Sequence, residues 1–317
     1  MRSMRKRRIV PVYVVLGFLE SGKSTLINSM FEDEDFSRGI KSLIISCEEG
    51  EVEYDGDLLN DFDSTYVQLD EKEEFTIEKL RELDAQYKPD RIILEFNSVW
   101  GMDYLGNTPM PQDWRVAQII TMVDATTYEN YMTNMRQLLT DPMKKAELIV
   151  VNRCKPEHPK SQWRRQMKAI NARTNIIFEN VDGTSEDGVA DEDLPYDMKA
   201  AVIEVKDEDF GTFYLDSMEH PERYHRKTVR LVGIAYPDRT LPKGYYMFGR
   251  EAMTCCADDI AQLGWICQGV QRPNARQHIR LTAQCITKTD GEESIVMLHE
   301  VRCEPADAPA DEYVTFN

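Results

Sequence analysis

The residues best suited to chemistry lie in one short stretch near the start of the chain. From Gly17 to Thr25 the sequence reads Gly-Phe-Leu-Glu-Ser-Gly-Lys-Ser-Thr, which fits the phosphate-binding pattern G-x-x-x-x-G-K-[ST]. The backbone amides of such a loop, together with the N-terminus of the helix after it, surround an anion. We therefore expect Lys23 to reach the β- and γ-phosphates of a nucleotide and the Ser24 hydroxyl to bind Mg²⁺.

The residues on both sides of this loop have the pattern that such a site needs. Residues 9–16 form an apolar, β-branched run typical of a buried strand, and Leu26, Ile27 and Met30 fall on one face of a predicted helix. A strand, a glycine loop and a helix in this order favour a nucleotide site over an ordinary glycine turn. The loop residues expected to bind the nucleotide are Gly17, Glu20, Ser21, Gly22, Lys23, Ser24 and Thr25.

Length and charge restrict what else the chain does. Its 317 residues suggest two domains, and 56 acidic against 38 basic side chains give a net charge of −18. Such a chain repels nucleic acids and anionic membrane surfaces, so we expect neither as a main partner. No run is long enough to span a membrane. Seven cysteines without framework spacing indicate free thiols and a cytoplasmic protein.

Strand-like runs alternate with helical patterns through the first 180 residues. The expected strands include residues 42–46, 65–69, 91–96, 118–123, 148–151 and 175–178, and the expected helices are residues 75–87, 127–139 and 161–172. This alternation predicts an α/β fold, with a mainly parallel sheet flanked by helices. Ligands of such sheets bind at the carboxyl ends of the strands. Residues 17–25, 47–51, 95–101 and 152–155 all follow strands and could converge there.

The pattern changes after residue 180. Residues 181–195 are acidic and contain glycine and proline, which is typical of a linker. Beyond it, short strands separated by turns predict a mostly β domain that is compatible with a small barrel, with a helix only around residues 257–262. We therefore expect a nucleotide-binding domain over residues 1–180, a linker over 181–199 and an OB-like domain over 200–317.

The order of these motifs resembles the CobW/HypB/UreG family of P-loop GTPases. The resemblance rests on the amino-acid sequence of residues 17–25 and on the stretches 47–55, 95–98 and 152–155. It covers roughly residues 9–180. It implies a GTPase of metallochaperone type, which uses GTP and Mg²⁺ and handles metals such as zinc, cobalt or nickel. The chain departs from the family at residues 65–74, where the family's Cys-x-Cys-Cys metal motif is missing.

Two further departures concern the nucleotide. The family's Glu-Thr-Thr-Gly reads Glu95-Phe96-Asn97-Ser98 here, so that Ser98 replaces the glycine that commonly senses the γ-phosphate. Its guanine signature Asn-Lys-x-Asp reads Asn152-Arg153-Cys154-Lys155, without the aspartate that pairs with guanine. Asn152 and Arg153 are expected nucleotide contacts, but a preference for GTP over ATP rests on the family alone.

Several acidic and thiol side chains are candidate metal ligands. Glu95, at a strand end, is expected to hold Mg²⁺ or its water and to act in catalysis with Lys23. Glu48 could contact Mg²⁺ from a first switch loop, or lie in a solvated acidic loop. Cys47 adds a soft ligand that would suit zinc, although a free cysteine is usually a small buried hydrophobe.

The second domain has a resemblance of its own. Residues 213–236 and 249–259 look like the soluble domain of an uncharacterised bacterial two-part permease, which carries a similar Arg-x-x-x-x-Cys-Cys-x-x-Asp run. Thiolates of Cys255 and Cys256, next to Asp258, could bind zinc or copper(I). The alternative is that both thiols are buried in the core.

Three functions are compatible with these observations. The first is a switch protein that binds and hydrolyses GTP and whose partner is a metal-dependent client or permease protein. The second is a nucleotide-binding scaffold that has lost hydrolysis, which the missing aspartate and Ser98 favour. The third is an ATPase or kinase that uses ATP.

Overall fold

A computed structural model describes residues 8–48, 54–186, 194–236, 238, 240–253, 260–269, 277–290, 293–314 and 316. By its internal contacts the chain divides into two compact units. The first combines residues 1–160 with 173–189, and the second combines residues 161–172 with 190–317.

The first unit is built on an eight-stranded sheet in the order β3-β2-β4-β1-β5-β6-β7-β8. Its pairings are parallel except that between β7 and β8, so the predicted mainly parallel sheet is confirmed. The strands are β1 (Val10–Gly17), β2 (Ser42–Ser46), β3 (Thr65–Gln68), β4 (Arg91–Glu95), β5 (Trp114–Asp124), β6 (Leu148–Cys154), β7 (Asn175–Asn180) and β8 (Ser185–Glu186).

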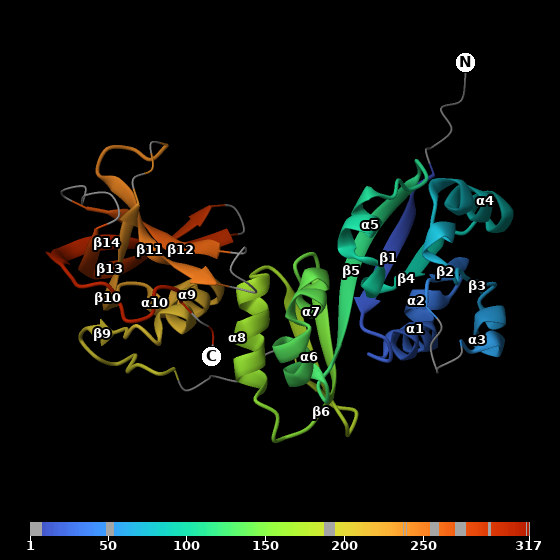
Figure 1. The fold of residues 1–317 in the computed structure, drawn as a ribbon, viewed down its shortest axis with the longest axis horizontal. Coiled ribbons are helices and arrows are strands. Elements are labelled where there is room, and N and C mark those ends of the chain that lie inside the picture. Colours follow the sequence, from blue (N-terminus) through green and yellow to red (C-terminus); the bar gives the residue numbers. More distant parts are fainter. Residues whose placement is uncertain are drawn as a thin grey trace, which may run out of the picture. The chain divides into compact units, whose positions relative to one another are not determined.

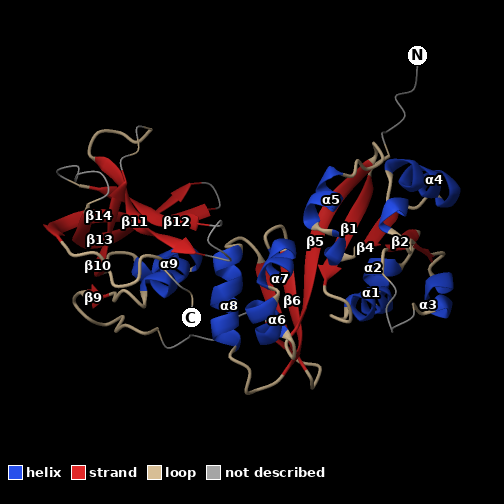
Figure 2. Cartoon of the chain, viewed as in Figure 1, coloured by secondary structure: helices blue, strands red, loops and turns tan. Residues whose placement is uncertain are grey.

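Helices lie on both sides of this sheet (Figures 1 and 2). Successive side chains of a strand point to opposite faces, so Val14 packs with the residues near α5 whereas Val15 packs with Ile27 and Phe31 of α1. The helices are α1 (Lys23–Glu32), α2 (Glu34–Ser37), α3 (Gly56–Asp61), α4 (Ile77–Tyr87), α5 (Met102–Asn107), α6 (Tyr128–Asn134) and α7 (Arg136–Met143), with 3-10 turns η1 (Lys72–Glu74) and η2 (Ser98–Trp100).

The second unit contains a closed barrel. Its strand order is β11-β12-β14-β13-β10-β9, and an additional pairing between β10 and β11 joins the ends of a five-stranded ring. The strands are β9 (Ile203–Glu204), β10 (Thr228–Tyr236), β11 (Tyr245–Met253), β12 (Ile260–Gln268), β13 (His278–Asp290) and β14 (Glu293–Pro305). Gly249 allows the close approach of β12, because a Cβ there would lie 1.8 Å from the Leu263 carbonyl oxygen. The prediction of a mostly β second domain is confirmed.

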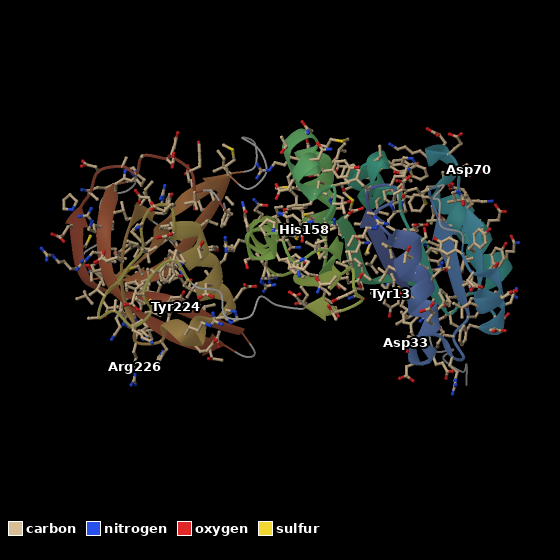
Figure 3. The ribbon with its side chains drawn as sticks, turned by 90° about the horizontal axis from the view of Figure 1, so that it is seen from below. Tyr13, Asp33, Asp70, His158, Tyr224 and Arg226 are labelled. Atoms are coloured by element: carbon tan, nitrogen blue, oxygen red, sulfur yellow. The ribbon has the colours of Figure 1, made fainter. Side chains whose placement is uncertain are left out.

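Within the described part of the second unit, three helices accompany the barrel, namely α8 (Lys160–Ile170), α9 (Phe210–Glu219) and α10 (Pro221–Tyr224). Phe210 and Phe213 of α9 pack against Trp265, whose indole nitrogen donates to the Ser217 hydroxyl at 3.0 Å. Tyr224, labelled in Figure 3, donates to Asp216 at 2.5 Å. The helix α9 was not expected from the sequence.

Helix α8 is placed between β6 and β7 along the chain, yet its residues from 161 onward belong to the second unit. Arg164 and Lys168 of α8 both pair with Glu219, at 3.0 and 2.5 Å. Ala169 packs against the core of the barrel unit. The two compact units are thus not continuous in sequence, because residues 161–172 belong to the second unit and residues 173–189 to the first. The domain boundary expected near residue 180 stays a prediction.

Two predicted helices differ in the structure. Of the helix expected around residues 257–262, residues 257–259 lie outside the described residues, and residues 260–262 form the start of β12, where they pair with β11. The helix expected over 127–139 is interrupted at Met135, which separates α6 from α7.

Candidate nucleotide site

The glycine loop runs from the end of β1 at Gly17 to the start of α1 at Lys23. Gly17 and Gly22 have φ angles of 142° and 93°, which L side chains rarely adopt. A Cβ on Gly17 would lie 2.6 Å from the Met122 carbonyl oxygen, and one on Gly22 would lie 2.4 Å from the amide nitrogen of Asn152. Both positions therefore require glycine, as expected of a loop whose backbone amides surround an anion.

Lys23 lies inside this loop with only 3% of its side chain exposed. Its ammonium donates to the carbonyl oxygens of Phe18 at 2.6 Å and Gly17 at 3.3 Å, and it lies 2.7 Å from Oε2 of Glu48. Three protein oxygens therefore surround the ammonium. Burial raises the pKa of Glu48, while Lys23 acts in the opposite direction.

Glu95 is a buried carboxylate at the carboxyl end of β4. The parallel register places it beside Ser46 of β2 and Val15 of β1, and it is 3% exposed. Ser24 donates to its Oε1 at 2.8 Å, and Ser46 and Tyr54 donate to its Oε2. Burial and the Glu95 charge raise the pKa of Tyr54, so its phenol stays protonated.

The oxygen atoms around Ser24 fit Mg²⁺. This ion usually binds through one or two carboxylates together with the phosphates of a substrate. A Ser24 hydroxyl that donates to Glu95 still has lone pairs for the ion. The donor set is thus made of hard oxygens, as Mg²⁺ requires.

The end of β6 reaches the glycine loop from the other side. The amide nitrogen of Asn152 donates to the Ser21 carbonyl at 2.8 Å, and Arg153 donates to the Glu20 carbonyl at 3.0 Å. Arg153 also pairs with Asp124, the residue beside Asn152 in the sheet register. The structure therefore brings both predicted β6 residues to the glycine loop.

A cavity of about 310 Å³ adjoins the loop on this side. The rings of Phe18 and Tyr131 stack at its wall, with centroids 4.4 Å apart. The Oγ of Ser21 is buried and has no hydrogen-bond partner among the described atoms. The lining residues are Phe18, Leu19, Glu20, Ser21, Met122, Val123, Asp124, Thr127, Tyr128, Tyr131, Leu139 and Arg153.

The remaining predicted residues are placed less centrally. Thr25 is exposed on the first turn of α1. Ser98 accepts a hydrogen bond from the Gly17 amide at 3.0 Å, so its side chain contacts the loop directly. Glu49 and Glu51 lie outside the described residues.

The candidate soft-metal ligands are not assembled into a cluster in the described part of the chain. Cys47 is 1% exposed, and burial together with Glu95 raises the pKa of its thiol. Within the described ranges, no group of three or more His, Cys, Asp or Glu side chains is placed to hold a metal ion. Cys255, Cys256 and Asp258 lie outside those ranges.

Four contacting residues were not singled out from the sequence, namely Ser46, Tyr54, Asp124 and Tyr131. Ser46 and Asp124 end strands of the predicted sheet, and this position was a usable signal. Tyr54 and Tyr131 follow no local pattern, because they reach the site through tertiary packing.

The fold and the loop define a P-loop nucleotide-binding protein. Residues 11–178 match the CobW/HypB/UreG nucleotide-binding domain, and the chain belongs to this family, as the motifs predicted. Residues 181–315 match the DUF1980 C-terminal domain. No curated protein matches the chain. No helix among the described residues combines the length and apolar character needed to cross a membrane.

Three solved structures are similar to parts of the chain. Hydrogenase maturation factor HypB from Archaeoglobus fulgidus is 18% identical, with 56% of this chain and 83% of that chain covered and a TM-score of 0.37. Zn(II)-bound YjiA GTPase from E. coli is 14% identical, covering 85% and 92%, with a TM-score of 0.40. HypB from Helicobacter pylori in complex with nickel is 13% identical, covering 53% and 78%, with a TM-score of 0.34.

Proposed function

We propose that the protein is a Mg²⁺-dependent switch that binds and hydrolyses a nucleotide, with GTP as the substrate that its family favours. The observation that carries this proposal is the convergence of Lys23, the Ser24–Glu95 pair and Asn152 on one glycine loop. A phosphate-binding loop alone would also serve a scaffold. A buried carboxylate on the Ser24 hydroxyl adds the part needed for metal-assisted phosphoryl transfer.

Each residue has a separate role in this mechanism. Lys23 and the loop amides would stabilise the charge that develops on the transferred phosphoryl group. Ser24 and Glu95 would hold Mg²⁺, which when bound neutralises charge on the phosphate oxygens. These groups act by position and charge and need not form a covalent intermediate.

Turnover is expected to be slow without a partner. Arg153 contacts the loop, but its guanidinium is held by Asp124 and by the Glu20 carbonyl. Both contacts are made by Nη1, and no motif of the sequence places another arginine as a finger. A partner that supplies a cation would accelerate hydrolysis.

The preference of the site for guanine or adenine is a separate question. Lys155 stands where a guanine-binding loop has its aspartate, and an ammonium cannot accept the donors of the guanine edge. GTP use is supported by the family and ATP use by this substitution. Direct competition between the two nucleotides for the same site decides between them.

The second unit is proposed to be an OB-like barrel that joins the switch to a client or permease protein in the cytoplasm. Its ring order, β10-β11-β12-β14-β13, is that of a five-stranded Greek-key barrel. A zinc site would need Cys255 and Cys256. Metal analysis of the purified protein, and of a variant with both cysteines changed to serine, tests this part.

Isothermal titration with GTP and Mg²⁺ tests the nucleotide site. Lys23→Ala should abolish binding, whereas Lys41→Ala, at a partly exposed lysine paired with Asp63, should not. Because Lys23→Ala leaves Glu48 buried without its partner, the double variant Lys23→Met with Glu48→Gln serves as a second, charge-balanced test. Folded wild-type protein that binds neither GTP nor ATP would refute the proposal.

Phosphate release separates the switch from the scaffold. Binding without release of phosphate, with Mg²⁺ present, would establish the scaffold function. Release that requires Glu95, tested with Glu95→Gln, would establish hydrolysis.

A further inference from the structure

Tyr54 contacts Glu95, the carboxylate that the proposed mechanism assigns to Mg²⁺. Its hydroxyl donates to Oε2 of Glu95, and Ser46 donates to the same oxygen at 2.6 Å. Oε1 of Glu95 accepts from Ser24 at 2.8 Å. The carboxylate of Glu95 is therefore held by donors from three separate parts of the chain.

We propose that Tyr54 is a positioning residue for the Mg²⁺ site, which aligns the carboxylate of Glu95 with the Ser24 hydroxyl. The inference rests on the proposed function, since it assumes that Ser24 and Glu95 hold Mg²⁺. Tyr54 itself does not contact the ion or the nucleotide in this proposal. It acts through Glu95.

The lone pairs of the carboxylate explain how this alignment works. Its two oxygens offer about four acceptor positions. Tyr54 and Ser46 fill both positions on Oε2, and Ser24 fills one on Oε1. The position that remains lies on Oε1, next to the Ser24 hydroxyl. This is the position through which Glu95 would hold Mg²⁺ beside Ser24.

Ser46 alone cannot give the same alignment. Its single hydroxyl proton has several acceptors within reach, among them Oε2 of Glu95 at 2.6 Å, the Glu48 carbonyl at 3.0 Å and the phenol oxygen of Tyr54. The phenol of Tyr54 also interacts with the Ser46 and Ser24 hydroxyls, and its own proton is donated to Glu95. Tyr54 therefore keeps Oε2 occupied whichever way the Ser46 hydroxyl turns.

The surroundings of Tyr54 fix its ring in place. The ring packs against Tyr66 of β3 with centroids 5.2 Å apart. The next residue, Asp55, caps α3 by accepting from the amides of Asp57 and Leu58, and its own amide donates to Asn28 of α1. The hydroxyl is thus anchored both by ring packing and by a helix cap.

The test compares Tyr54→Phe with Tyr66→Phe. The first removes only the hydroxyl on Glu95 and keeps the ring contact, whereas the second removes an equivalent hydroxyl from the other ring of the pair. Binding of a fluorescent GTP analogue is titrated in EDTA and over a range of Mg²⁺ concentrations. Tyr54→Phe should need about tenfold more Mg²⁺ for its half-maximal effect, which is the loss of one hydrogen bond to a charged group.

The EDTA titration separates positioning from a merely structural role. Tyr54→Phe should bind nucleotide as the wild type does in EDTA, because the phosphate loop is unchanged. Tyr66→Phe should match the wild type under both conditions. Ser46→Ala should shift the Mg²⁺ dependence in the same direction as Tyr54→Phe, and it decides the outcome if Tyr54→Phe does not fold.

Each result has one meaning. A wild type that binds no nucleotide overturns the proposed function and this inference with it. If nucleotide binding by the wild type depends on Mg²⁺ and the Tyr54→Phe variant shows the same dependence, only this inference is overturned. If Tyr54→Phe weakens nucleotide binding equally in EDTA and in Mg²⁺, the inference is also overturned, because the Tyr54 hydroxyl would then support only the fold.

Discussion

The buried pair of Lys23 and Glu48 predicts an unusual gain of function on mutation. Both side chains are nearly inaccessible, at 3% and 7%, and their charged atoms are 2.7 Å apart. The other two donors of Lys23 are directed at backbone carbonyls of the loop. A phosphate oxygen that reaches Lys23 must therefore take the position of the Glu48 carboxylate, so Glu48→Gln should strengthen nucleotide binding.

The size of the gain follows from the contact that is lost. A hydrogen bond to a charged group contributes about 1.5–3 kcal/mol and one between neutral groups about 0.5–1.5 kcal/mol. Glutamine leaves an acceptor for the ammonium but removes its counter-charge, so the nucleotide should displace an interaction weaker by roughly 1–1.5 kcal/mol. This corresponds to binding that is about five- to tenfold tighter. The nucleotide-free variant should also melt at a lower temperature, because Lys23 then lacks its counter-charge.

The assay is titration of a fluorescent GTP analogue, first in EDTA and then in Mg²⁺. Glu34→Gln is the control, because Glu34 is an exposed carboxylate paired with Arg38 on the surface. The control should bind as the wild type does. A Glu48→Gln variant that binds equally or more weakly in EDTA would refute the reasoning. A gain in EDTA that disappears in Mg²⁺ would instead support the predicted contact of Glu48 with the ion.

Three further predictions concern stability. Burial raises the pKa of the Cys154 thiol to about 11, above its ordinary 9.0. As pH rises from 9 to 11 the unfolded chain loses this proton before the folded chain does, so the free energy of unfolding should fall. Urea denaturation over this pH range should show a smaller fall for Cys154→Ala than for the wild type. Glu219→Gln should cost the barrel unit about 1–2 kcal/mol by weakening its contacts with Arg164 and Lys168, measured by thermal melting; an unchanged melt would contradict this. Phe213→Ala, at a fully buried site, should cost about 3–5 kcal/mol in the same measurement, whereas Val301→Ala, 66% exposed, should change it by less than about 0.5 kcal/mol.

Much of the first unit could be predicted because its signals are local. Apolar β-branched runs such as residues 9–16 mark strands buried on both faces, and the glycine loop marks the turn between β1 and α1. Glu95 and Asn152 could be assigned to the site because parallel strands end at the same edge of a sheet. That these two residues contact the loop from opposite sides follows from the strand order, with β1 between β4 and β5.

What could not be predicted depends on contacts between distant residues. The pairing of Glu48 with Lys23 and of Tyr54 with Glu95 joins segments whose approach no sequence spacing encodes. Helix α9 was missed because Phe210, Phe213 and Leu215 are buried without a regular polar face, so that its periodicity is weak. The closure of the barrel by β10 and β11 is likewise a tertiary event.

The position of α8 has a consequence for how the protein is made. Ribosomes deliver the chain from its N-terminus, so Arg164 is synthesised 55 residues before Glu219, its partner in the second unit. During that interval α8 cannot pack Ala169 against the barrel core or pair Arg164 and Lys168 with Glu219. A newly made chain would thus carry an incompletely packed helix until the barrel follows, and a protein truncated after residue 180 would retain that exposed surface permanently.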